Sequence, residues 1–289
     1  MAARLVLCYH GVMNGPIQTE LRGTMSVGEM LKEWRQRRHL SQQDLAFDAD
    51  VSARHLSFLE TGRAQPSRDM LFNLAEHLSI PLRERNALLV AAGFAPAYSD
   101  ELLGDPGMEA ARKAIDFILS GHEPFPALAI DRYWNLVASN KALGLLLEGV
   151  DPSLLAPPVN VLRLSLHPLG LAPRIVNFKQ WRAHACGGVR KQIDVSGDPI
   201  LRSLLDEISS YPVPDVQHPV IAADEHNYAG LAVPFRLATS SGMLSFVTTT
   251  TVFGTPVSVT LSELAVESFY PADAATAIRL RSSALAAEL

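Results

Sequence analysis

The first third of the chain repeats one pattern, in which a serine precedes a short run of apolar residues at helical spacing. Ser26 and Glu29 have the spacing of a capping box, and Met30, Leu31 and Trp34 follow on one helical face. The same kind of N-terminal cap recurs at Ser41, Ser52 and Ser67. The pattern predicts a bundle of short helices over residues 26–92.

Two of these helices, predicted to begin after Ser41 and Ser52, are separated by a short turn. Asp50 in that turn is expected in the left-handed conformation, because aspartate tolerates a positive φ better than most residues. Leucines of both helices form an inward stripe, and the small Ala46 lets the two helices cross closely. This geometry is typical of a helix-turn-helix, whose second helix can enter a DNA groove.

The segment SQQDLAFDADVSARHLSFLETGRAQPS, at residues 41–67, resembles the XRE/Cro-repressor family of helix-turn-helix regulators. The matching pairs are Ser41-Gln42, Leu45-Ala46, Val51-Ser52, Leu59-Glu60, Gly62-Arg63 and Pro66-Ser67. The chain departs from the family pattern at Phe47, which is usually polar, and at Asp50, which is usually glycine. The resemblance implies a homodimer that binds a pseudo-palindromic operator in double-stranded DNA.

The resemblance also implies individual DNA contacts. Gln42 and Arg63 would touch phosphates, and Gln43 joins the same DNA-contacting set. The outer face of the second helix carries short or hydrogen-bonding side chains that would face the bases, namely Ser52, Ala53, Arg54 and Ser57. The alternative interpretation is a small helical bundle whose arginines are merely solvated.

Charge limits how DNA binding can arise. The 25 basic and 30 acidic residues give a net charge of −5, and the excess of acid lies beyond residue 85. Residues 26–85 carry nine residues of each sign. Any DNA binding must therefore depend on where the basic side chains point rather than on bulk charge.

Length and composition predict two domains, because 289 residues that are 48% hydrophobic can form two cores. Residues 93–107, GFAPAYSDELLGDPG, contain five glycines or prolines and are predicted to be a linker. We therefore divide the chain into a loose tail at 1–25, a helix-turn-helix domain at 26–92, the linker, and a second domain at 108–289. Apolar runs are too short to span a membrane, and two cysteines in unlike surroundings fit a reducing cytoplasm.

The second domain is predicted to be α+β, with an antiparallel sheet of about five strands. Strands are predicted at residues 127–130, 136–138, 231–237, 243–253 and 263–269. Helices are predicted at residues 108–119, 141–147, 175–186 and 199–209. Asn140 is expected to cap the second of these helices, and Gly187-Gly188 to end the third.

The strand, strand, helix order at the start of this domain resembles the opening of a PAS sensor domain. Residues 125–275 as a whole resemble the MmyB-type ligand-binding domain, a PAS-like module found behind XRE-type helix-turn-helix domains. The resemblance is carried by PALAIDRYWNLVASN from Pro126, NVLRLSLHPLGLAPRIVNFKQW from Asn160, and TTTVFGTPVSVTLSELAVESFYPAD from Thr249. It implies a small apolar or fatty-acid-like ligand bound between the sheet and the helices.

Six side chains are candidates for contacts with such a ligand, and they are Trp134, His167, Arg174, Asn177, Trp181 and His184. Arg174 could hold a carboxylate with two hydrogen bonds, and Trp181 and His184 share nearly the same helical face. The alternative is that the second domain senses no ligand and serves only dimerisation or protein contacts.

No enzyme activity, cofactor or metal site is expected. His184 and Cys186 stand two positions apart, and on a helix such side chains point in different directions, so they could not form a dyad. The chain also has no phosphate-binding glycine motif with a following Walker lysine.

Overall fold

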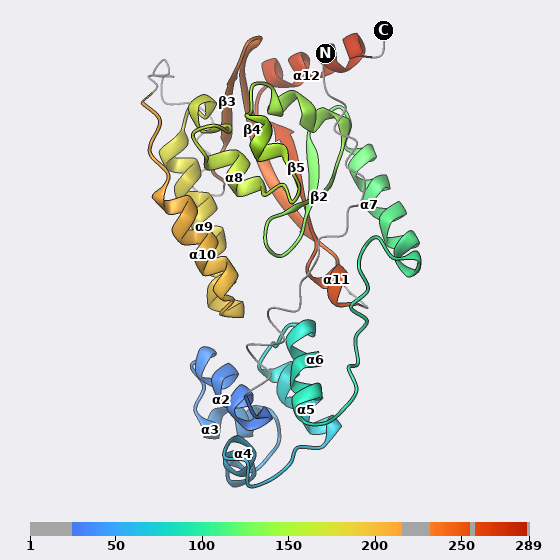
Figure 1. The fold of residues 1–289 in the computed structure, drawn as a ribbon, viewed down its shortest axis with the longest axis vertical. Coiled ribbons are helices and arrows are strands. Elements are labelled where there is room, and N and C mark those ends of the chain that lie inside the picture. The colour runs from blue at the N-terminus through green and yellow to red at the C-terminus, as the bar shows by residue number, and fades with distance from the viewer. Residues whose placement is uncertain (1–24, 216–231, 255–257, 288–289) are drawn as a thin grey trace.

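A computed structural model describes residues 25–215, 232–254 and 258–287, and it has two parts, one helical and one α+β (Figure 1). The helical part lies at one end of the elongated molecule. The predicted tail lies outside the described residues except for Met25, and so does most of the segment between the predicted helix 199–209 and strand 231–237. Within the described residues, no helix combines the length and apolar character needed to cross a membrane.

The serine caps organise the helical part as predicted. Its helices are α2 (Val27–Arg37), α3 (Gln42–Asp48), α4 (Ala53–Glu60), α5 (Arg68–His77) and α6 (Leu82–Ala91). Ser26 and Ser41 form complete capping boxes, and the hydroxyls of Ser52 and Ser67 each accept a backbone N–H. Asp50 has a φ of 53°, which confirms its predicted left-handed conformation.

A buried ion pair joins α2 and α4 of the helical part. The Nε and Nη2 atoms of Arg35 on α2 donate to the two carboxylate oxygens of Glu60 on α4, at 2.6 and 2.9 Å. Gln42 on α3 donates to the same carboxylate at 2.8 Å. Burial pushes the pKa of Glu60 upward, but the hydrogen bonds from Arg35 and Gln42 outweigh it, and the pKa is lowered. Three helices are therefore joined through one carboxylate.

The second part is built on an antiparallel sheet of five strands, in the order β2-β1-β5-β4-β3. The strands are β1 (Ala127–Ile130), β2 (Leu136–Ser139), β3 (Phe235–Thr239), β4 (Gly242–Val252) and β5 (Ala265–Pro271). The helices are α7 (Glu109–Gly121), α8 (Val161–Leu166), α9 (Phe178–Ser196), α10 (Pro199–Ser210), α11 (Val259–Ser262) and α12 (Ala274–Ala287). The predicted α+β class and the five-strand sheet are thus confirmed.

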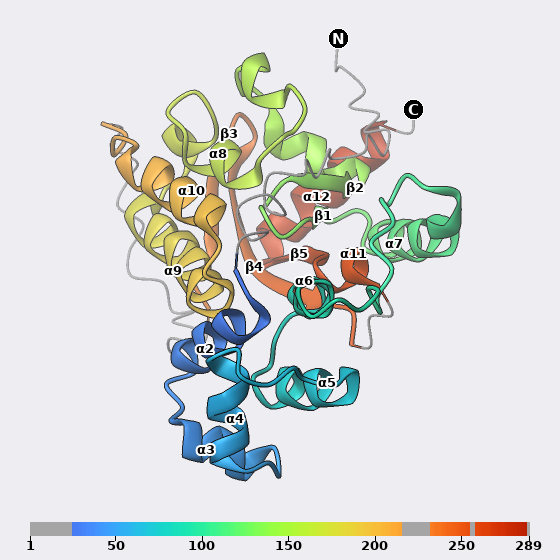
Figure 2. The ribbon, with the colours of Figure 1, turned by 60° about the horizontal axis from the view of Figure 1, so that its bottom comes forward.

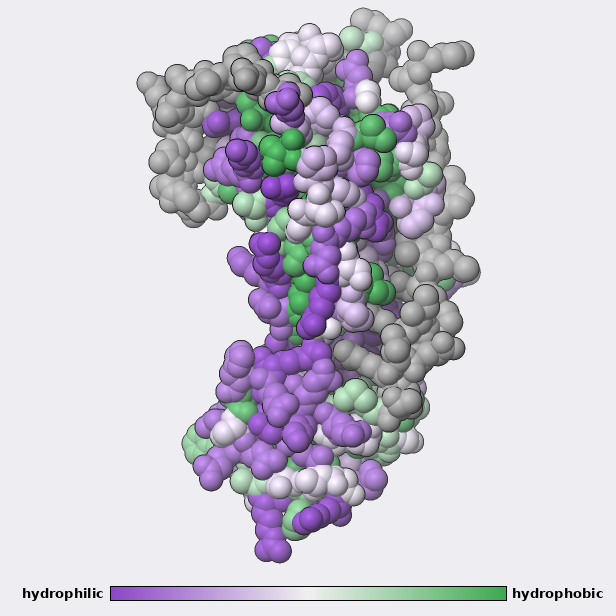
Figure 3. Space-filling model, turned by 60° about the vertical axis from the view of Figure 1, so that its left-hand side comes forward, coloured by the Kyte–Doolittle hydropathy of each residue, from purple (hydrophilic) through white to green (hydrophobic). Residues whose placement is uncertain are grey.

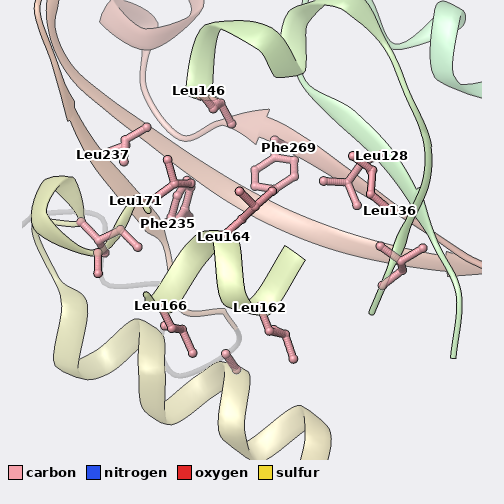
Figure 4. Packing of buried hydrophobic residues seen from close by; sticks show 14 of the residues in the cluster. Leu128, Leu136, Leu146, Leu162, Leu164, Leu166, Leu171, Phe235, Leu237 and Phe269 are labelled. Atoms are coloured by element: carbon pink, nitrogen blue, oxygen red, sulfur yellow. The ribbon is translucent and has the colours of Figure 1, made fainter. Parts of the chain in front are cut away.

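The two faces of the sheet pack against different helices. One face carries large side chains such as Phe246 and Phe269, which pack with α8, α9 and α10. Figure 4 shows Leu164 of α8 beside Phe269 in this layer. The opposite face carries small residues such as Ala127 and Ala129, which pack against α7. Figure 2 shows α9 and α10 on one side of the sheet and α7 on the other.

Two local predictions in this part were wrong. Asn140 does not cap the 3-10 helix that follows it (Lys141–Leu147); its side chain is buried and bonds to the backbone of Ala127 and Phe125. Helix α9 also continues past Gly187-Gly188 to Ser196, where Gly197 takes the left-handed conformation expected of a helix end. The earlier pair of glycines remains helical because the intrahelical hydrogen bonds continue through it.

The two parts meet where the predicted linker passes between α6 and α11. The side chain of Asn86 on α6 holds the backbone of Ala97 and Tyr98 in this segment. The Val259 N–H then donates to the Ser99 carbonyl at 2.8 Å, which ties the same segment to α11. Residues 97–99 are therefore hydrogen-bonded to both parts of the molecule.

Candidate DNA-binding surface and ligand cavity

Helices α3 and α4 form a helix-turn-helix whose outer surface is open. The Val51 N–H donates to the Ala46 carbonyl at 2.9 Å and closes the turn between them. Of the seven predicted DNA-contacting residues, the exposed ones are Gln43, Ser52, Arg54 and Arg63, and the half-buried ones are Gln42, Ala53 and Ser57. Figure 3 shows that the helical end of the molecule presents mostly hydrophilic residues on one side.

Arg54 projects from the first turn of α4. Its guanidinium carbon lies 5.4 Å from the centroid of the Phe58 ring, one helical turn further on. A stacked arginine of this kind keeps its N–H groups available in the plane of the guanidinium, where they can donate to two acceptors. The geometry is compatible with a contact to a base edge.

Gln42 has a structural role that the sequence did not reveal. One of its amide N–H groups is held by the buried Glu60 carboxylate, which leaves the rest of the amide for an outside partner. The Ser52 hydroxyl similarly accepts the His55 N–H as the α4 cap. Both side chains therefore position the helices, whatever they contact in DNA.

A cavity of about 310 Å³ lies between the large-residue face of the sheet and helices α8 and α9. The lining is mainly aliphatic and aromatic. It consists of Leu128, Trp134, Leu136, Leu143, Leu146, Leu147, Val161, Leu162, Leu164, Ser165, Leu171, Trp181, His184, Ala185, Gly188, Phe235, Thr248, Thr250, Glu267 and Phe269. A concave, mostly apolar site with a few polar groups is the usual form of a small-molecule site.

Three of the six predicted ligand-contacting residues line this cavity. The indole N–H of Trp134 donates to Gln192, and that of Trp181 to the Ser165 hydroxyl, each at 2.7 Å. The two tryptophans therefore form part of the cavity wall, and their N–H groups already have partners.

The ring centroid of His184 lies 5.5 Å from that of Trp181. Burial first, and then the positive charge of Lys191, lower the pKa of His184, which favours the neutral imidazole.

The other three predicted residues are not among those that line the cavity. Arg174 donates to the Leu146 carbonyl at 2.5 Å. Asn177 joins the start of α9 to the strand region through the backbone of Pro234 and Arg236. The Nδ1 atom of His167 accepts the N–H of Leu169 in its own loop.

Sequence reasoning missed the polar groups that the sheet contributes. Thr250 of β4 and Glu267 of β5 stand opposite each other in the strand register, and both line the cavity. Burial raises the pKa of Glu267 to about 7. The available signal was strand alternation, since Glu267 lies two positions from Phe269 and must share its face.

A helix-turn-helix joined to a domain with an apolar cavity is typical of a transcription regulator that has a separate ligand-binding domain. Comparison with family models agrees in both parts: residues 31–85 match a helix-turn-helix family, and residues 111–282 match the MmyB-like transcription regulator ligand binding domain. The chain belongs to this MmyB-like family. It is a DNA-binding transcription regulator with a C-terminal ligand-binding domain.

The other comparisons add little. No curated protein sequence matches the chain. Among solved structures, the chain is similar to one described as an RNA-binding light-oxygen-voltage receptor. The two sequences are 13% identical over 94% of this chain and 67% of the other, with a TM-score of 0.24.

Proposed function

We propose that this regulator acts as a homodimer, and that a small, mainly apolar ligand in the PAS-like C-terminal domain controls its binding to a pseudo-palindromic operator. The observation that carries the proposal is the apolar cavity between the sheet and helices α8 and α9. Two recognition helices related by twofold symmetry would reach half-sites about 34 to 36 Å apart, or a multiple of that distance.

In this proposal α4 recognises the DNA sequence. Ser52, Ala53, Arg54 and Ser57 face the bases, and Gln42, Gln43 and Arg63 contact the phosphates. The exposure of Arg54 and Arg63 supports these roles. Phosphate contacts hold the helix in register, and the arginine at the start of α4 contributes the base preference.

A short chain of contacts connects the cavity with the DNA-binding part. Trp134, which lines the cavity, belongs to the turn between β1 and β2 that also contains Arg132. Arg132 donates to Glu263 at 2.8 Å, and Glu263 accepts two further bonds from Arg83 on α6. A ligand that favours one position of this turn would therefore bias the position of the helix-turn-helix.

The proposal includes no catalytic step and no cofactor. Cys186 is buried, and its sulfur lies 3.8 Å from the Ser209 hydroxyl. His184, two residues earlier, faces the cavity instead. This separation supports a binding role for the site.

Selection of bound fragments from a random pool of duplex DNA, with and without an extract of cell metabolites, tests the proposal. We expect one enriched pseudo-palindromic sequence whose recovery changes with the extract. Arg54→Ala should lose the enrichment, whereas Arg281→Ala, on the distant helix α12, should retain it. Native mass spectrometry of the same protein separates the roles: a bound small molecule supports a sensor, and a bare dimer supports the interface-only alternative.

A further inference from the structure

Glu267 occupies the middle of the cavity face of the sheet. It stands opposite Leu128 of β1 on one side and Thr250 of β4 on the other. Phe269, two positions along the same strand, also lines the cavity. The carboxyl group thus lies among leucine, phenylalanine and threonine side chains.

Within the described part of the chain, no hydrogen bond or ion pair to the Glu267 carboxyl is found, and burial is the one cause of its raised pKa. The residue is half-buried, and its carboxyl oxygens are open to the cavity rather than fully enclosed, so a bound ligand can reach them. A carboxyl that faces a cavity without a protein partner is a functional-site candidate, whose missing partner a ligand can supply.

The surroundings of Glu267 favour one kind of partner. Among the described lining residues the one basic side chain is His184, whose pKa is lowered. Arg174, the predicted carboxylate holder, is bonded to the Leu146 carbonyl instead. Above pH 7, where Glu267 is ionised, a fatty-acid carboxylate in this cavity would meet its like charge and no lysine or arginine from the described lining.

We propose that the cavity selects an aliphatic amine, with its ammonium head on the Glu267 carboxylate beside the Thr248 and Thr250 hydroxyls and its chain among the leucines and aromatic rings. An ammonium group carries three donors and no acceptor, which complements a carboxylate and two hydroxyl oxygens. This inference rests on the proposed function, since it takes the cavity to be the ligand site, and it specifies the chemistry of the head group.

Calorimetric titration of the purified full chain at pH 8 with decylamine and with decanoic acid tests the inference. Both probes are kept below the concentrations at which they aggregate. The two probes share one chain length and differ in the head group. Decylamine is expected to bind the wild-type protein at least about tenfold more tightly than decanoic acid, the effect of one lost charge-assisted hydrogen bond. Glu267→Gln keeps the size of the side chain and should remove this preference.

Glu109→Gln is the matched control, because Glu109 is exposed on α7 and pairs with Lys113 in the same helix, away from the cavity lining. This variant should keep the wild-type preference. Equal or tighter binding of decanoic acid by the wild-type protein overturns the inference and leaves an apolar ligand site standing. A preference for amine that survives Glu267→Gln overturns it as well. Binding of neither probe contradicts the proposed apolar ligand site itself.

Discussion

Arg83 on α6 and Glu263, directly after α11, form a two-pronged ion pair between the two parts of the chain. The Arg83 Nε and Nη2 atoms lie 2.8 and 3.0 Å from the two oxygens of Glu263. The remaining Arg83 nitrogen, Nη1, donates to Asp100 of the connecting segment at 2.5 Å. One arginine of the helix-turn-helix part is thereby held by both the connecting segment and the C-terminal domain.

Arg83→Ala is expected to loosen this junction without unfolding either part. Glu263 keeps Arg132 as a partner, so the charge left behind is still compensated. Hydrogen exchange should therefore increase at the Val259 amide, which bonds to Ser99 across the junction. Glu76→Ala, which removes the more exposed ion pair of Arg85 on the same helix, is the control and should leave that amide protected. Unchanged exchange in Arg83→Ala would show that the ion pair does not hold the two parts together.

Glu60→Ala is expected to destabilise the helical part by about 3 to 5 kcal/mol, because it leaves Arg35 charged and buried without its carboxylate. Denaturant unfolding followed by circular dichroism measures the change. Glu109→Ala breaks an exposed ion pair on α7 and should cost less than about 0.5 kcal/mol. A Glu60→Ala protein as stable as that control would mean that the buried pair contributes little.

The stability difference between Glu267→Gln and the wild-type protein is expected to depend on pH. The pKa of Glu267 is raised to about 7 from an ordinary value near 4.5, so the folded state binds its proton more tightly than the unfolded state. That stabilising contribution is complete below pH 4.5 and is lost as pH rises through 7. Relative to the wild type, the variant should therefore gain up to about 3 kcal/mol in unfolding free energy between pH 4.5 and 8.

Denaturant titrations of both proteins across this range give the difference. His184 also faces the cavity, from α9, but it is present in both proteins and contributes equally to each. A difference that stays constant from pH 4.5 to 8 would show that Glu267 keeps its ordinary pKa.

The elements that the sequence predicted best are those defined by local signals. Ser41 and Ser52 lie directly before their helices, and the capping bonds join residues three positions apart, so the spacing alone locates the helix starts. The left-handed Asp50 is likewise a property of one short turn. Short apolar runs, one alternating segment and the threonine-rich run similarly located the strands of the sheet.

The features that the sequence did not reveal depend on contacts between distant residues. Asn140 could serve as a cap by its position, but its amide bonds to Phe125 and Ala127 once the chain turns back. From its sequence neighbours alone, the Arg174 guanidinium is expected to be free for a ligand. In the structure it donates to the Leu146 carbonyl, 28 residues earlier. Glu267 could be placed on one face of a strand, but the sequence does not show that this face borders a cavity.

The proposed function depends on the recognition of DNA sequence by α4 through Arg54. Fluorescence anisotropy of the full chain on its selected duplex and on a scrambled duplex tests it. Arg54→Ala is expected to weaken binding to the selected duplex by about 1 to 3 kcal/mol and to leave the scrambled duplex nearly unaffected, while Arg63→Ala should weaken both and reduce the salt dependence. Equal losses on both duplexes with Arg54→Ala would contradict it.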